Sequence, residues 1–170
     1  MIDSFRDKYF FLSNFFPCVI RYREVSYRSV EAAFQAQKID TALPEEMRKT
    51  LQRRFSDLSP DQAKHLGRRV ELRPDWENVK DGIMRELLLV KFGSGKLREW
   101  LLATGDETLV EGNTWHDNYW GSCICPRCRD RGRNELGKAL MAVRRELQCD
   151  DRARGIDEEY EKPEHDIRRG

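Results

Sequence analysis

The sequence has no long apolar run, no excess of charge of one sign and no internal repeat. No segment approaches the roughly 20 apolar residues that cross a bilayer, and we expect no signal peptide. Lysine and arginine together number 31, and aspartate and glutamate number 30. This balance argues against a protein that binds nucleic acid through a broad basic surface. We therefore expect a cytoplasmic protein that makes no contact with a membrane.

Cysteine is scarce, and its arrangement argues against a disulfide framework. The chain has five cysteines, an odd number. Three of them have the spacing of a zinc knuckle: Cys123, Cys125 and Cys128. A structural zinc site needs four ligands, and the fourth would have to be His116, Cys149 or Cys18. No second knuckle follows, so we expect no metal and no cofactor, and keep these three cysteines as candidate ligands.

Helical periodicity dominates the chain. Apolar spacing and capping residues predict helices over residues 29–38, 44–55, 60–67, 76–92, 97–102 and 134–147. Residues 19–22 and 25–27 alternate apolar and polar side chains and predict a hairpin, although Arg23-Glu24 is an unusual tight turn. Residues 8–12 and 108–111 are candidate short strands. The prediction is an α+β fold: a mostly helical single domain with a small antiparallel sheet.

The composition changes after Cys149. Residues 150–170 are mostly charged, with isolated apolar side chains and no helical or strand period. Such a segment buries too little apolar surface to offset its ordering entropy. We therefore predict a folded domain over residues 1–149 and a charged, disordered tail over residues 150–170.

The segment Ser29 to Lys38, SVEAAFQAQK, is the first candidate for chemistry. Glu31, Gln35 and Lys38 stand at i, i+4 and i+7, so a helix places them on one face. A carboxylate, an amide and an amine that project together can perform acid–base chemistry and position a substrate. The alternative interpretation is a solvated helix face with no function.

The segment TWHDNYWG is the second candidate. Trp115, Tyr119 and Trp120 surround Asp117 within six residues. Aromatic planes stack against nucleobases, and a carboxylate partly desolvated among them suits proton transfer. The alternative is that the tryptophans fill the core and Asp117 caps a turn.

Several ordered blocks resemble the NADAR family, which includes YbiA-like N-glycosidases. The blocks are FLSNFFP at 11–17, SxExxFQxxK at 29–38, LGRRVELRPDW at 66–76, LLATGDETLVEGNTWHDNYWG at 101–121 and NELGKALMAVRREL at 134–147. Together they span most of residues 5–147. The resemblance implies a YbiA-like fold and hydrolysis of the bond between ribose C1 and a base nitrogen.

The resemblance also implies the class of substrate. Known substrates of the family are phosphorylated ribosylaminopyrimidine intermediates of riboflavin biosynthesis and ADP-ribose attached to guanine, in DNA or RNA. The expected partner is therefore a small-molecule nucleotide or an ADP-ribosylated guanine. The sequence leaves open a non-catalytic module that binds ADP-ribose or a nucleotide, and it does not determine the oligomeric state.

The transition state of such a reaction carries positive charge on the ribose, and the departing base needs a proton. We assign Glu31 as the main catalytic carboxylate and Asp117 as the second. Lys38 either contacts a phosphate or attacks the opened sugar as an amine. Candidate substrate-binding residues are Asn14, Gln35, Arg68, Arg73, Trp76, Trp115, Tyr119 and Trp120. Of these, Trp76 matches a tryptophan that lies in the active site in the family pattern.

Overall fold

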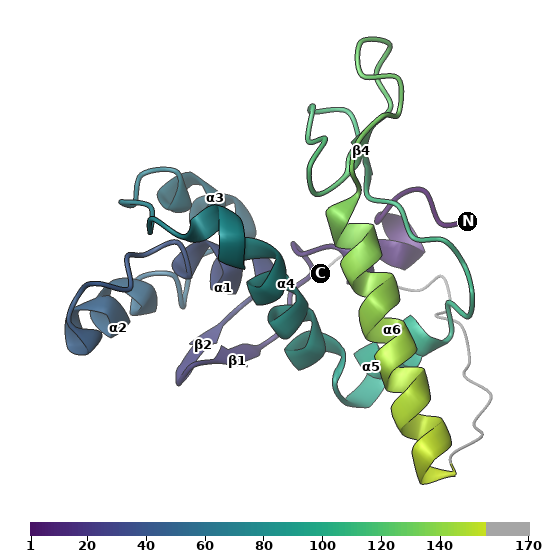
Figure 1. The fold of residues 1–170 in the computed structure, drawn as a ribbon, viewed down its shortest axis with the longest axis horizontal. Helices are drawn as coiled ribbons and strands as arrows, with labels where there is room; N and C mark the ends of the chain where they lie inside the picture. Colours follow the sequence, from purple (N-terminus) through teal and green to yellow (C-terminus); the bar gives the residue numbers. More distant parts are fainter. Residues whose placement is uncertain (156–170) are drawn as a thin grey trace. The chain divides into compact units, whose positions relative to one another are not determined.

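The computed structural model describes residues 1–155 (Figure 1). The elements in order are a 3₁₀ helix η1 (Asp7–Leu12), β1 (Ile20–Tyr22), β2 (Val25–Tyr27), α1 (Val30–Ala36), α2 (Glu45–Arg53), α3 (Pro60–Gly67), α4 (Trp76–Phe92), α5 (Gly95–Leu102), β3 (Gly112–Asn113), β4 (Ser122–Cys123) and α6 (Glu135–Arg154). They form two compact units, residues 14–91 and residues 1–13 with 92–155, and each is described by itself. The expected mostly helical α+β fold with a small antiparallel sheet is confirmed.

The predicted hairpin opens the unit of residues 14–91. β1 pairs antiparallel with β2, with Ile20 opposite Tyr27 and Tyr22 opposite Val25, and these four side chains are buried. Arg23 and Glu24 both have positive φ, 48° and 67°, which is the backbone of a tight turn that normally favours asparagine and glycine. Burial of one face of each strand fixes the register despite the unfavourable turn residues.

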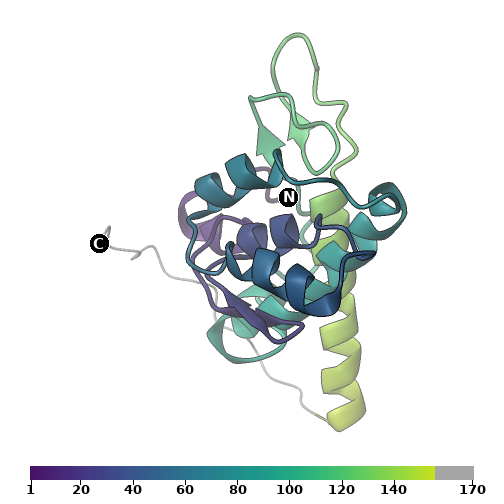
Figure 2. The same cartoon turned by 90° about the vertical axis from the view of Figure 1, so that its left-hand side faces the viewer.

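Helix α1 is the central element of this unit (Figures 1 and 2). It packs against α2, α3 and both strands of the hairpin. All seven of its residues are buried, and Ser29 Oγ accepts a hydrogen bond of 3.1 Å from the backbone N–H of Ala32. The predicted N-cap is confirmed, and the interpretation of a solvated helix face is wrong for the whole of α1.

Helices α3 and α4 complete the unit. Ser59 and Gln62 form the capping box expected at the start of α3. In α4, Ile83 and Leu87 are buried as predicted. Val90 was predicted on the same apolar face but is 42% exposed, because the buried face in the last turn passes through Leu88 and Phe92.

The other unit begins with a 3₁₀ helix where a strand was predicted. Phe11 and Leu12 are consecutive and both fully buried, which a strand with one solvent-facing side does not allow. The ring of Phe11 packs against Phe92 and Trp100, with centroids 6.5 and 5.4 Å away. Local aromatic packing therefore decides the conformation of this segment.

The strand predicted over residues 108–111 is also wrong. Among these residues only Leu109 forms a bridge, and it pairs with Ile2. The regular pairing comes directly afterwards, where β3 runs parallel to β4. Adding a Cβ to Gly112 would place it 2.2 Å from the backbone oxygen of Asp3, so the close approach of the N-terminal segment accounts for this glycine.

Helix α6 extends past the predicted domain boundary. Leu136, Leu140, Val143 and Leu147 are buried as expected, but the helix continues to Arg154 and ends at Gly155, which has a φ of 71°. Residues 150–154 are therefore helical, and the rest of the predicted tail, 156–170, lies outside the described residues. No helix within residues 1–155 is both long enough and apolar enough to span a bilayer.

Candidate active site

Glu31 is a buried carboxylate in the first turn of α1. Glu31 is 7% exposed, and its Oε1 accepts a hydrogen bond of 2.8 Å from Gln35 Nε2. The backbone N–H of Glu31 donates to the carbonyl oxygen of Asn14 at 3.0 Å, which fixes the start of the helix to the preceding loop. Gln35 thus orients the carboxylate, and the backbone bond fixes the position of the residue that carries it.

Gln35 is held between Glu31 and Gly67 of α3. A Cβ on Gly67 would lie 2.0 Å from Gln35 Oε1 and 3.0 Å from Gln35 Cβ. Gly67 does not have a positive φ, and the C-cap residue after it, Arg68, is right-handed with a φ of −78°. A left-handed backbone therefore does not explain this glycine. The sequence predicts that α3 ends here, which is correct. The reason for a glycine is instead that the Gln35 side chain occupies the space of a Cβ.

Lys38 follows α1 and lies beside Trp76. Its Nζ is 5.8 Å from the centroid of the Trp76 ring, within the range of a cation–π contact. Within residues 1–155 no carboxylate lies at ion-pair distance from this ammonium group. Burial lowers the pKa of Lys38 below its ordinary value; the Glu31 carboxylate opposes that shift, and the cations Arg68 and Lys64 add to it.

Lys64 and Arg68 therefore place positive charge near Lys38 within this unit. Lys64 was not singled out in the sequence, although its spacing of four residues from Arg68 on one helix was the available signal. Arg73 differs, because its guanidinium donates to both carboxylate oxygens of Asp75 at 2.6 and 2.8 Å. This pair lowers the pKa of Asp75 and occupies the fork that was predicted to bind phosphate.

Trp76 and Asn14 also belong to the unit of residues 14–91. Trp76 is 6% exposed and packs against Phe34 with ring centroids 4.9 Å apart. Asn14 is buried and donates through Nδ2 to the sulfur of Met84 at 3.6 Å, while its Oδ1 has no hydrogen-bond partner in the described chain. A buried amide oxygen of this kind suits the substrate-binding role predicted for Asn14.

Asp117 lies in the other unit, in the loop between β3 and β4. Its Oδ1 accepts hydrogen bonds from the backbone N–H groups of Tyr119 at 3.1 Å and Trp120 at 2.9 Å. Asn113 binds the backbone of Asp117 in both directions, at 2.7 and 3.2 Å. The turn-capping role that the sequence left open is present, and one oxygen of the carboxylate is committed to it.

The aromatic residues of this loop are only partly buried. Trp115 is 51% exposed, with Arg6 Cζ 5.8 Å from its ring. Tyr119 packs edge to face on Trp120 with centroids 5.1 Å apart, and Arg133 Cζ lies 4.6 Å from the Tyr119 ring. The interpretation of Trp115 as core filler is wrong, because half of its surface faces solvent.

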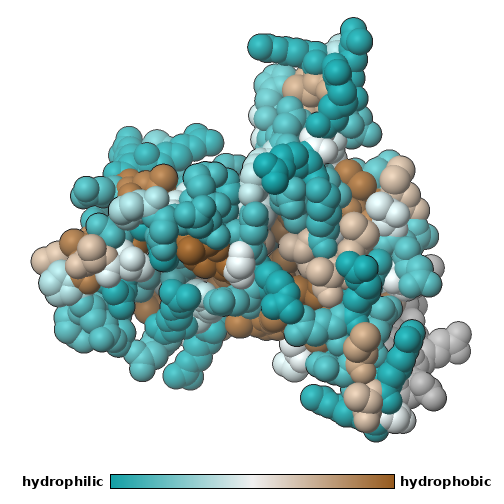
Figure 3. All heavy atoms as spheres, in the orientation of Figure 1, coloured by the Kyte–Doolittle hydropathy of each residue, from teal (hydrophilic) through white to brown (hydrophobic). Residues whose placement is uncertain are grey.

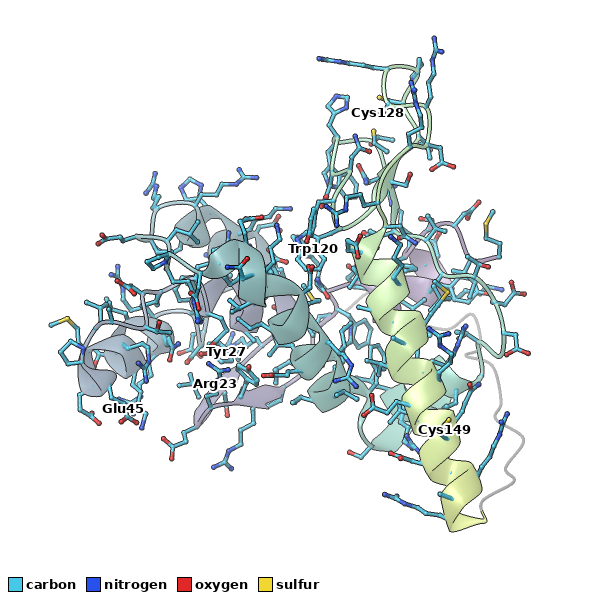
Figure 4. All side chains as sticks on the ribbon, viewed as in Figure 1. Arg23, Tyr27, Glu45, Trp120, Cys128 and Cys149 are labelled. Atoms are coloured by element: carbon cyan, nitrogen blue, oxygen red, sulfur yellow. The ribbon has the colours of Figure 1, made fainter. Side chains whose placement is uncertain are left out.

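The cysteine segment gathers around a histidine of the same loop. Cys123, Cys125, Cys128 and His116 place their ligand atoms within 4.8 Å of one another. Figure 4 shows Trp120 next to the start of α6. Cys128, in the segment after β4, lies at the end far from α6. The sequence offered three possible fourth partners for the cysteines, and the structure selects His116.

The structure thus brings Glu31, Gln35 and Lys38 together in the unit of residues 14–91, with Trp76 and Asn14. Asp117 and its aromatic neighbours form a second group in the other unit. The first group supplies a fixed carboxylate, an amine with a lowered pKa and nearby positive charge. These groups can stabilise a cationic sugar, attack a carbon centre and attract a phosphate.

Relatives of similar sequence include proteins that are named N-glycosidases. An N-glycosidase of Nostoc punctiforme is 40% identical over 142 residues, covering 79% of this chain and 83% of the relative. N-glycosidase YbiA of Escherichia coli is 39% identical over 148 residues, covering 85% of each chain. A riboflavin biosynthesis protein of Vibrio vulnificus is 39% identical over 141 residues, covering 81% of this chain but 35% of that protein.

The fold comparison points to the same group. The solution structure of Escherichia coli YbiA matches 89% of this chain and 89% of that chain with a TM-score of 0.69 and 32% sequence identity. The family model for the NADAR domain matches residues 3–148. This chain belongs to the NADAR domain family.

Proposed function

We propose that this protein is an N-glycosidase that cleaves the bond between ribose C1 and a base nitrogen. The observation that carries the proposal is the buried Glu31 carboxylate, which accepts a hydrogen bond from Gln35. The nearby amine of Lys38 has no carboxylate partner in the described chain. Relatives at about 40% identity are named N-glycosidases, which supports the same activity. A binding module needs neither a fixed carboxylate nor a reactive amine.

In the proposed reaction Glu31 stabilises the positive charge that develops on the ribose as the C1–N bond breaks. The bonding electrons leave with the base nitrogen, which takes up a proton. The neutral amine of Lys38 then bonds to C1 and loses a proton. Water hydrolyses this adduct, releases the sugar and restores the amine. The sequence-based assignment of Asp117 as the second carboxylate stays a prediction.

Two substrate classes fit this site, and a separate observation favours each. The cations Lys64 and Arg68 lie close enough to Lys38 to lower its pKa, and their positive charge suits a pyrophosphate and supports ADP-ribosylated guanine, free or within DNA or RNA. Relatives named riboflavin biosynthesis proteins support a phosphorylated ribosylaminopyrimidine. Both classes present a ribose C1–N bond and at least one phosphate.

The test is direct cleavage of both substrates. Purified protein is incubated with ADP-ribosylated guanosine and, separately, with ribosylaminopyrimidine phosphate, and the products are resolved by mass. We expect release of the free base from at least one substrate. Glu31→Gln is the control for contaminating activity and should release none above background. Tight binding of both compounds without cleavage would instead support a non-catalytic nucleotide-binding module.

A further inference from the structure

The loop that carries Asp117 and the segment that follows it together hold a compact set of metal-ligating atoms. His116 Nδ1 lies 3.3 Å from Cys128 Sγ, 3.6 Å from Cys125 Sγ and 3.7 Å from Cys123 Sγ. All five cysteines of the chain are free thiols. One ring nitrogen therefore faces three sulfur atoms at almost equal distances.

Hydrogen bonding does not account for this arrangement. A ring nitrogen carries either one hydrogen or one lone pair, so it makes one good hydrogen bond and not three. A tetrahedral zinc ion with Zn–S distances of about 2.3 Å and a Zn–N distance of about 2.0–2.1 Å requires N···S separations of about 3.6 Å. The three measured separations lie around this value. The lone pair of the ring nitrogen and the three sulfurs thus surround a position suitable for one ion.

Nearby groups hold the ligand sulfurs in place. Asn118 Nδ2 donates to Cys128 Sγ at 3.2 Å, and the backbone N–H of Cys128 donates to Cys125 Sγ at 3.4 Å. Asn118 Oδ1 in turn accepts from the backbone N–H of Cys123 at 3.0 Å. Donors to ligand sulfurs and groups that fix ligand orientation are the usual surroundings of a metal site.

The loop also lacks an apolar core of its own. Figure 3 shows a mainly hydrophilic surface over this part of the molecule, and Ile124 is 62% exposed. His116, Arg129 and Asp130 have positive φ values of 66°, 54° and 53°, a conformation that is unfavourable for residues other than glycine. A loop with so little buried apolar surface needs another source of order, and a bound metal provides it.

We propose that His116, Cys123, Cys125 and Cys128 bind a structural zinc ion. Three thiolates and one imidazole fill four positions and leave none for a substrate, which is the pattern of a structural site. His116 precedes β4, whereas Cys125 and Cys128 follow it. The ion therefore joins the loop before β4, which carries Asp117, to the cysteine segment after β4 and orders both. The proposal departs from the sequence-based expectation of no metal, which rested on the absence of a second knuckle.

The first measurement is the metal content of the full-length protein after purification without a metal-affinity tag. We expect about one zinc per chain. Cys125→Ser and His116→Asn should each lower the zinc content severalfold. Cys149→Ser is the matched control, since Cys149 is exposed on α6, and its zinc content should equal that of the wild type.

The second measurement uses the unmodified protein, so that it does not depend on a variant that folds. Thiol labelling is compared before and after a zinc chelator, with labelled positions identified by peptide mass. Cys123, Cys125 and Cys128 should become reactive only after chelation, whereas Cys149 reacts in both states. Absence of zinc, another metal at the same stoichiometry, a disulfide among these cysteines, or equal zinc loss in Cys149→Ser would each overturn the proposal.

Discussion

Gly67 is the residue at which space near the candidate site is most restricted. Gly67→Ala puts a methyl group where Gln35 Oε1 now lies, so Gln35 must rotate and release Glu31. We expect a loss of about 1–3 kcal/mol of stability, the usual cost of overpacking, together with a clear fall in kcat. Thermal unfolding and turnover of the proposed substrate measure the two effects.

The control for this variant is Gly82→Ala. Gly82 lies in α4, and a Cβ there meets no atom within 4 Å. The extra methyl group raises helix propensity by about 0.8–1 kcal/mol, so the melting temperature should rise slightly and kcat should not change. If Gly67→Ala behaves like Gly82→Ala, the position of Gln35 does not matter to the reaction.

Lys38 determines the expected pH dependence. Burial holds the pKa of Lys38 below its ordinary value of 10.5, and only the deprotonated amine attacks carbon. The rate of cleavage should therefore rise with pH and level off below 10.5. Borohydride added during turnover should trap a covalent adduct at Lys38, and Lys38→Arg should abolish both the adduct and the turnover.

Lys64→Arg is the matched control for this change, because it keeps the positive charge on α3. It should retain the turnover and the pH profile of the wild type. A rate that falls with rising pH, combined with an active Lys38→Arg protein, would mean that Lys38 serves as a cation for phosphate.

Among the elements, the last turn of α6 contributes to the stability of the fold, although its charged sequence predicts a disordered tail. Asp151 is 6% exposed and forms an ion pair with Arg98 of α5. Asp151→Ala leaves the largely buried Arg98 without this partner and should cost about 1–3 kcal/mol of stability. Chemical denaturation measures the loss.

The exposed neighbour Asp150 gives the control. Asp150→Ala should change the free energy of unfolding by no more than about 0.5 kcal/mol. Removal of residues 150–170 should destabilise the protein about as much as Asp151→Ala does, because it also removes the partner of Arg98. An unchanged melting temperature after that deletion would contradict the role of Asp151.

Elements specified by local patterns could be predicted from the sequence. The hairpin at residues 20–27, the capping box at Ser59 and the apolar face of α6 each depend on residues close together in the chain. The 3₁₀ helix at residues 7–12 was missed because packing of Phe11 on Phe92 and Trp100 decides its conformation. No short-range pattern contains that information.

The same distinction applies to the candidate site. Glu31, Gln35 and Lys38 were predicted together from helical spacing, which holds for Glu31 and Gln35, whereas Lys38 lies in the turn that follows α1. The role of Gly67 and the selection of His116 depend on contacts between separate segments, so spacing alone could not identify them. Arg73 stays a predicted substrate-binding residue, although its Nε and Nη2 already donate to Asp75, two residues away.

At the scale of the whole molecule, the positive charge around Lys38 predicts binding of the product. Free ADP-ribose should bind and inhibit cleavage, and calorimetry measures the affinity. Arg68→Gln removes one of the cations that act on Lys38 and should weaken this binding severalfold. Arg69→Gln makes the same charge change at an adjacent exposed residue and should have little effect. No binding at millimolar ADP-ribose would favour the riboflavin-type substrate.

The central claim is that Glu31 is the catalytic carboxylate, and Glu31→Gln tests it most directly. The substitution keeps the size of the side chain but removes its charge and its titratable proton. The protein should fold, bind product and lose roughly two to four orders of magnitude in kcat, the usual scale for such groups. If Glu31→Gln cleaves an N-glycoside that the wild type cleaves, within a few-fold of the wild-type rate, α1 is not the catalytic centre.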